Sequence, residues 1–196
     1  MSTASVGRGL RQLSKDCGAD LLVVGSCRRA AIGRLLRGDD TQGSLSGAAC
    51  AVAVAPHRYA QASRQIDTIG VAYNGSPESN AALVAARALA TRNGATLHAL
   101  SAVWPTATLA WPAGRTSLGG VWSAMTFETF ERDASERLSA LTGVDGRVTV
   151  GPPGDELLAF AGEVDLLVAG SRGHGPLRRP LLGSTSAYLA GNRDPR

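Results

Sequence analysis

The feature that most constrains the fold is a glycine motif that directly follows an apolar, strand-like run. The run is Val164–Ala169, and the motif, with the pattern G-x2-G-x9-G-S, begins at Gly170 and ends at Ser184. Glycines let the backbone turn sharply and approach a ligand without a Cβ in the way. The stretch that follows, Ser184–Ala190, is expected to be helical, and the free N–H groups and dipole of a helix N-terminus attract phosphate. A strand, a glycine turn and a helix N-terminus in this order predict a site for the phosphates of a nucleotide.

The strand and the first part of its glycine motif occur twice in the chain. Ala19–Ser26 (ADLLVVGS) recurs as Val164–Ser171 (VDLLVAGS). A repeat of this kind indicates two related structural units. We therefore divide the chain into a partial domain at residues 1–57, a linker at residues 58–65, and a second domain at residues 66–196 that lacks its last strand.

The first copy does not keep the phosphate-binding pattern. Arg28 stands where the second glycine is expected, and Asp39 replaces the serine. A carboxylate at a helix N-terminus satisfies the dipole itself and occupies the place that a phosphate would take. We therefore interpret Gly25 and Gly38 as remnants of the fold without a ligand.

Composition limits the class of protein. A hydrophobic content of 44% with only 5% aromatic residues suits a core of Ala, Val and Leu between a sheet and helices. The net charge of +4 is spread along the chain, which is typical of a solvated surface and not of a nucleic-acid interface. The three cysteines form neither a CxxC pair nor an even set, which favours a reduced, cytoplasmic chain. No apolar run approaches the roughly 20 residues of a membrane helix, so we expect no membrane partner. The spread of the charge gives no reason to expect a nucleic-acid partner.

Strand-like and helix-like segments alternate, which predicts an α/β fold with an open parallel sheet and helices on both faces. The expected strands are Leu21–Gly25, Ala51–Pro56, Ile66–Tyr73, Thr96–Val103, Gly146–Val150 and Leu166–Gly170. The expected helices are Arg8–Cys17, one that ends at Leu45–Ala49, Glu78–Thr91, Phe127–Leu141, Asp155–Ala161 and Ser184–Ala190, and the expected long loop is Trp104–Val121. The preference for right-handed crossovers places Ile69–Tyr73 between the strands Thr96–Val103 and Leu166–Gly170.

The first strand and turn of the second copy resemble those of the universal stress protein family. The residues that carry the resemblance are Ile69–Ser79 (IGVAYNGSPES), and the glycine motif matches the closing signature of the ATP-binding branch of that family. The resemblance covers nearly the whole chain, as the back half of one domain followed by most of a second. It implies a Rossmann-like (adenine nucleotide alpha hydrolase-like) sheet of order 3-2-1-4-5 that holds ATP at the carboxyl ends of strands one and four. That location agrees with the general rule for open α/β sheets.

The resemblance also implies which residues bind the nucleotide. The aspartate of the family's first loop corresponds to Asn74, which keeps one acceptor, loses the charge and gains a donor. The implied nucleotide-binding residues are Ala72, Asn74, Ala102, Gly170, Gly173, Gly183, Ser184 and Thr185. The implied ligand is ATP with Mg²⁺ as its counter-ion, and we expect no metal site built by the protein.

No catalytic residues are expected, and two functions remain. A P-loop needs Gly-Lys-Ser/Thr, but the single lysine, Lys15, follows Ser14, and no Cys/His cluster has zinc spacing. At most a slow, incidental ATP hydrolysis is expected. The first function is an ATP-binding regulatory module in the stress response, and the glycine motif favours it. The second is a degenerate scaffold that acts by dimerisation without a nucleotide, and Asn74 and the lacking strand favour it.

The lacking last strand has a consequence for assembly. It leaves the outer edge of Leu166–Gly170 unpaired, and folded proteins pair or cover such edges, so we expect Ala51–Pro56 to lie beside it in a sheet of about six strands. The strand would come from the same chain or from a second copy. A homodimer or an intrachain pairing of the two copies is therefore expected.

Overall fold

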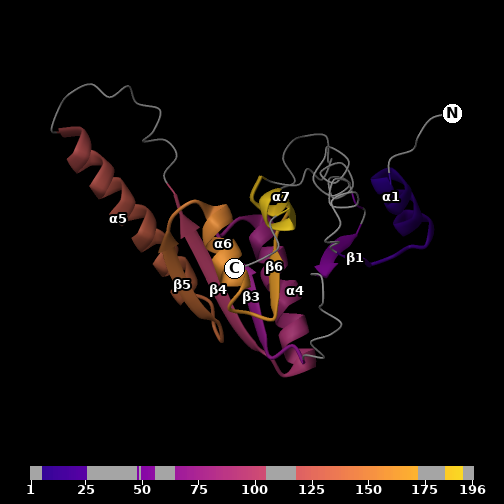
Figure 1. Cartoon of the computed structure of the whole chain (residues 1–196). Helices are drawn as coiled ribbons and strands as arrows, with labels where there is room; N and C mark the ends of the chain where they lie inside the picture. The colour runs from indigo at the N-terminus through magenta and orange to yellow at the C-terminus, as the bar shows by residue number, and fades with distance from the viewer. Residues whose placement is uncertain are drawn as a thin grey trace. The chain divides into compact units, whose positions relative to one another are not determined.

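The computed structural model describes residues 6–25, 48, 50–55, 65–104, 118–171 and 184–191 (Figure 1). In chain order the elements are α1 (Val6–Asp16), β1 (Leu21–Gly25), β2 (Ala51–Ala55), β3 (Thr68–Ala72), α4 (Pro77–Asn93), β4 (Thr96–Val103), α5 (Leu118–Ser139), β5 (Asp145–Val150), α6 (Pro153–Ala161), β6 (Leu166–Ala169) and α7 (Ser184–Gly191). They divide between two compact units. The second unit is Ile66–Gly170, and the first contains α1, β1, β2 and α7.

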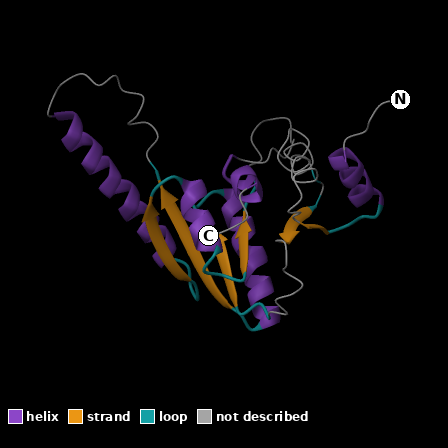
Figure 2. Ribbon diagram, in the orientation of Figure 1, coloured by secondary structure: helices purple, strands orange, loops and turns teal. Residues whose placement is uncertain are grey.

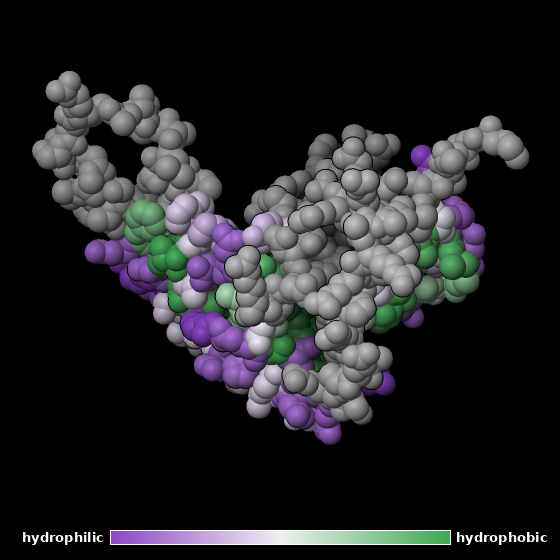
Figure 3. All heavy atoms as spheres, viewed as in Figure 1, coloured by the Kyte–Doolittle hydropathy of each residue, from purple (hydrophilic) through white to green (hydrophobic). Residues whose placement is uncertain are grey.

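In the first unit, β1 and β2 form a two-stranded parallel sheet and pair over their whole length. Several large apolar side chains of this unit are exposed: Leu13 by 57%, Leu21 by 52% and Val23 by 61%. Figure 3 shows this apolar surface over α1 and β1.

The second unit is built on a four-stranded parallel sheet of order β5-β4-β3-β6 (Figure 2). The expected position of Ile69–Tyr73 between Thr96–Val103 and Leu166–Gly170 is confirmed, and the order corresponds to strands 3-2-1-4 of the expected series. The central strand β3 is buried on both faces, as in sheets that helices cover on both sides. The α/β fold with an open parallel sheet is therefore as the sequence predicts.

The core of the second unit follows the alternation of side chains along β3. Ile69 and Val71 point to the face covered by α4 and α5, while Gly70 faces Phe160 of α6. The core cluster on the first face consists of Ile69, Val71, Tyr73, Ala82, Leu83, Ala86, Ala90, Leu97, Ala99 and Leu138. Small alanines along α4 let that helix pack closely on the sheet.

The helix α4 has the ends that its sequence predicts. The Ser76 side chain caps the helix by accepting the N–H of Ser79, and Pro77 occupies the first helical position. Gly94 ends the helix in the left-handed conformation, with φ of 68°, and its N–H donates to the carbonyl of Ala90. The carboxyl end of β3 and the turn into α4 are therefore held in a defined geometry.

The start of α5 differs from the expectation. The helix begins at Leu118 and not at Phe127, so Leu118–Val121 is helical where a loop was expected. The loop was inferred from Pro105 and Pro112, which both precede the helix, and from glycines. Two of these glycines lie in the first turn of the 22-residue helix, which tolerates a cost of about 1 kcal/mol for each of them.

The described residues form two sheets, one of two strands and one of four, and the expected pairing of Ala51–Pro56 with Leu166–Gly170 in a sheet of about six strands stays a prediction. The strand β2 pairs with β1, and β6 is the last strand of the four-stranded sheet of the second unit. Pairing of β6 with a second copy, and the division into domains at residues 57 and 66, stay predictions. The helix expected to end at Leu45–Ala49 and the linker expected at 58–65 lie largely outside the described residues.

Candidate functional site

The carboxyl ends of β3, β4 and β6 meet at one edge of the second unit's sheet. Ala72 lies opposite Leu100 on one side and Ala169 on the other, so Ala102 and Gly170 come to the same edge. The chain leaves β3 towards β4 and later returns to the other side of β3 as β6. In open α/β sheets, ligands bind outside the carboxyl ends of the strands at such a switch point.

The turn after β3 is held by side chains of its own. The Asn74 Oδ1 atom accepts the N–H of Ser76 at 3.0 Å, which is an Asx turn. Gly75 has a φ of 79°, a conformation that favours glycine. The Tyr73 hydroxyl donates to Oδ1 of Asn80 at 3.0 Å and ties the end of β3 to α4. Asn74 is exposed, so the turn is ordered and accessible.

Arg137, from the last turn of α5, lies against this turn. A Cβ placed on Gly75 would be 2.8 Å from Cδ and 3.3 Å from Nε of Arg137. The absence of a side chain at Gly75 therefore makes room for the arginine. Sequence reasoning gave no signal for Arg137, because the approach depends on how α5 packs on β4 and β5.

Gly170, the first glycine of the motif, packs against the start of α4. A Cβ at this position would be 2.6 Å from both the carbonyl carbon and oxygen of Glu78. The backbone of α4 thus occupies the direction in which a side chain would point. This packing is a reason for glycine at position 170 that does not involve a ligand, and its ligand role stays a prediction.

The remaining motif residues are described only in part. Gly173 and Gly183 lie outside the described residues. Ser184 and Thr185 begin α7, which confirms a helix at this point, and α7 belongs to the first unit. The second unit therefore brings together Ala72, Asn74, Ala102 and Gly170. A joint site with Ser184 and Thr185 stays a prediction.

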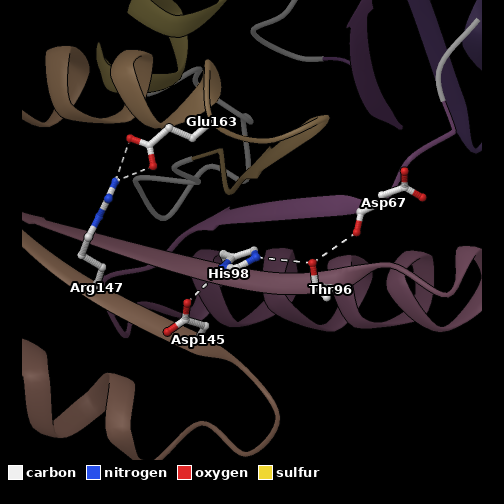
Figure 4. Close-up of polar contacts among 6 residues, drawn as sticks. All are labelled: Asp67, Thr96, His98, Asp145, Arg147 and Glu163. Atoms are coloured by element: carbon white, nitrogen blue, oxygen red, sulfur yellow. Dashed lines mark hydrogen bonds and ion pairs between the residues drawn. The ribbon is translucent and has the colours of Figure 1, made fainter.

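A second set of polar contacts lies towards the amino ends of the strands (Figure 4). The Nδ1 atom of His98 is 3.2 Å from Oδ2 of Asp145, and its Nε2 is 3.4 Å from the Thr96 hydroxyl, which donates to the Asp67 carbonyl. Thr96 and Asp145 begin β4 and β5, and Asp67 precedes β3. These groups thus lie at the edge of the sheet opposite the candidate site.

Arg147 links β5 to the end of α6. One of its terminal nitrogens is 3.1 Å from each carboxylate oxygen of Glu163, and its guanidinium lies over the Phe160 ring at 5.7 Å from the ring centre. Both partners of the ion pair are about half exposed. The contact is therefore a connection between elements at the protein surface.

A cavity of about 620 Å³ lies between α5 and β5 and contains none of the implied nucleotide-binding residues. It is lined by Glu128, Glu131, Arg132, Ser135, Leu138, Ser139, Leu141, Val144, Gly146 and Val148. Within the described parts of the chain, no three His, Cys, Asp or Glu side chains are grouped to hold a metal ion. In the same residues, no helix is both long and apolar enough to span a bilayer.

Comparison with known proteins gives a family and a fold. The model of the universal stress protein family matches residues 65–192. No curated protein matches the chain. Among solved structures, the universal stress protein UspA from Lactobacillus plantarum is 23% identical with a TM-score of 0.50, over 66% of this chain and 94% of that chain.

Two further structures match nearly the whole chain. A universal stress protein from Archaeoglobus fulgidus is 21% identical with a TM-score of 0.61, over 96% of this chain and 64% of that chain. A functionally unknown protein from Pseudomonas aeruginosa PAO1 is 17% identical with a TM-score of 0.62, over 97% of this chain and 66% of that chain. The chain thus spans less than two thirds of the length of either protein, and the likeness shows the fold.

Proposed function

This chain belongs to the universal stress protein family, and we propose that it binds an adenine nucleotide, ATP, at the carboxyl edge of its second unit. One observation carries the proposal: Gly170, the start of the G-x2-G-x9-G-S motif, follows β6 beside β3, whose turn contains Asn74. The most diagnostic sequence motif of the chain is thus attached to the switch point of the sheet, where ligands bind in folds of this class.

The implied residues would contact different parts of the nucleotide. Ala72 and Ala102, at the ends of β3 and β4, would contact the nucleoside together with Asn74. The motif residues Gly170, Gly173, Gly183, Ser184 and Thr185 would surround the phosphates with backbone N–H groups. Mg²⁺ would accompany the phosphates as a counter-ion.

The proposed role is regulatory and not catalytic. The His98–Asp145 pair, which has a composition suited to proton transfer, lies at the opposite edge of the sheet from the proposed nucleotide. ATP binding would therefore act by changing the conformation or the partner of a cytoplasmic stress-response protein. A second copy of the chain is the partner that we propose.

Nucleotide analysis of the purified protein tests the proposal directly. Mass spectrometry of the material released by denaturation should find one adenine nucleotide per chain. Gly173→Leu should abolish binding, because a side chain would block the approach of the backbone to the phosphates. The matched variant Gly25→Leu, in the first copy, should leave binding unchanged. Equal losses from both variants, or two nucleotides per chain, would contradict the proposed site.

The second candidate is a scaffold that acts by dimerisation without a nucleotide. The packing of Gly170 on Glu78 favours it, because this glycine then has a structural reason that needs no ligand. Under this alternative, the purified protein carries no nucleotide, and millimolar ATP changes neither its thermal unfolding nor its sedimentation. An ATP-dependent rise in the unfolding temperature would exclude it.

A further inference from the structure

Two side chains at or beside the turn after β3, Asn74 and Arg137, offer hydrogen-bond donors. The Asn74 Oδ1 atom is already used by the N–H of Ser76, which leaves its Nδ2 amide as the free end. Arg137, beside Gly75, carries five N–H donors and no acceptor. The turn is therefore suited to a ligand group that accepts hydrogen bonds.

The charge of Arg137 is not neutralised by an ion pair within the described residues. The nearby acidic side chains of α5, Asp133 and Glu136, lie within 4.0 Å of Arg132 instead. At the turn itself, position 74 is a neutral asparagine. An exposed guanidinium thus stands next to the carboxyl end of β3 with its charge available to a ligand.

The same charge has a simpler explanation, which an experiment must separate from ligand binding. Arg137 lies in the last turn of α5, where a cation interacts favourably with the helix dipole. However, the dipole does not require the close approach of Cδ and Nε to Gly75. That approach holds the arginine stem at the turn and reduces the entropy that it would lose on binding a ligand.

We propose that Arg137 binds a phosphate group of the nucleotide and makes the site select nucleotides over nucleosides. This inference rests on the proposed function, since it concerns the same site. A guanidinium binds phosphate oxygens through paired, charge-assisted hydrogen bonds, which a neutral nucleoside cannot provide. Arg137 is thereby a binding residue that the glycine motif does not include.

The test compares ATP with adenosine by titration calorimetry on the full chain. Arg137→Met, which keeps the length of the stem, should weaken ATP binding by about tenfold or more and change adenosine binding by less than about twofold. Arg137→Lys, which keeps the charge, should recover part of the loss. The control is Arg132→Met on the same helix, which should leave both affinities unchanged. Thermal unfolding of each variant checks that the fold is retained.

The outcomes separate this inference from the proposed function. If the unchanged chain binds ATP but Arg137→Met weakens ATP and adenosine equally, the arginine contacts the nucleoside and the phosphate assignment is wrong. If Arg137→Met leaves ATP binding unchanged, Arg137 does not bind the phosphate, and its charge interacts only with the dipole of α5. If the unchanged chain binds neither ligand, the proposed function itself fails and the role of Arg137 fails with it.

Discussion

Gly70, in the middle of β3, leaves space for an aromatic ring, and filling that space tests the packing of the second unit. A Cβ at Gly70 would be 2.7 Å from Cε1 and 2.9 Å from Cζ of Phe160, and 3.1 Å from a methyl carbon of Val164. Gly70 and Phe160 are both buried, so neither can move towards solvent freely. The Phe160 ring thus packs directly against the backbone of β3 at Gly70.

Gly70→Ala should destabilise the second unit because the ring must move by nearly 1 Å to restore an ordinary carbon–carbon contact of about 3.5–4.0 Å. Overpacking of a core costs about 1–3 kcal/mol. Alanine also lowers the entropy of the unfolded chain relative to glycine, which offsets about 0.4–1 kcal/mol of the overpacking cost. We therefore expect a net loss of up to about 2.5 kcal/mol, which at its upper end is a substantial part of the stability of an ordinary domain.

Phe160→Leu should relieve the clash, since leucine lacks the two ring carbons that meet the new methyl group. By itself this change should cost about 1.5 kcal/mol. The double variant should be more stable than the sum of the single effects predicts, by about 1 kcal/mol, as for residues in direct contact. Urea unfolding, with amide hydrogen exchange at β3 and β4 to report on the second unit alone, measures all four proteins. Single effects that add to within about 0.3 kcal/mol, or a stabilising Gly70→Ala, would refute the packing argument.

Two further predictions concern the residues on either side of β6, Asp165 before it and Gly170 after it. Asp165→Ala should cost about 1–3 kcal/mol in the same urea assay, because Oδ2 of Asp165 accepts hydrogen bonds from the N–H groups of Asp67 and Thr68 and from the Thr68 hydroxyl. The exposed control Asp145→Ala should cost less than about 0.5 kcal/mol, and equal costs would contradict the assignment. Gly170→Ala should lower the thermal midpoint of the nucleotide-free protein, since its Cβ would meet the backbone of α4 at 2.6 Å. An unchanged midpoint would show that α4 can shift to accommodate the new methyl group without a loss of stability.

The sequence predicted the arrangement of the second unit because its signals are local and repeated. The cap at Ser76, the proline at Pro77 and the end at Gly94 each fix a helix boundary by a mechanism that acts within a few residues. The alternation of strands and helices then leaves few topologies, since crossovers are right-handed. The position of β3 between β4 and β6 was expected on these grounds, and the full order β5-β4-β3-β6 agrees with the series that the family resemblance implies.

The contacts that shape the candidate site were not predictable in the same way. Arg137 is far from Gly75 in the sequence, and their approach depends on how α5 packs on β4 and β5. The start of α5 at Leu118 was missed because glycines and prolines were given the same weight, although only proline excludes a helix interior. The first case is a contact set by tertiary packing, and the second is a local signal that was given too much weight.

Gly170 shows why a glycine motif alone cannot settle whether a nucleotide binds. The backbone of Glu78 takes the place of its missing side chain, so selection for packing would keep this glycine whether or not a phosphate is present. A loss of ATP binding in a Gly170 variant would therefore be ambiguous, since it would follow from displacement of α4 as readily as from a blocked ligand. Arg137 has no such double role in the core, because it is exposed and its charge can be removed while its stem is kept. The difference between ATP and adenosine in Arg137→Met is thus the measurement that separates a nucleotide site from a turn that is shaped by packing alone.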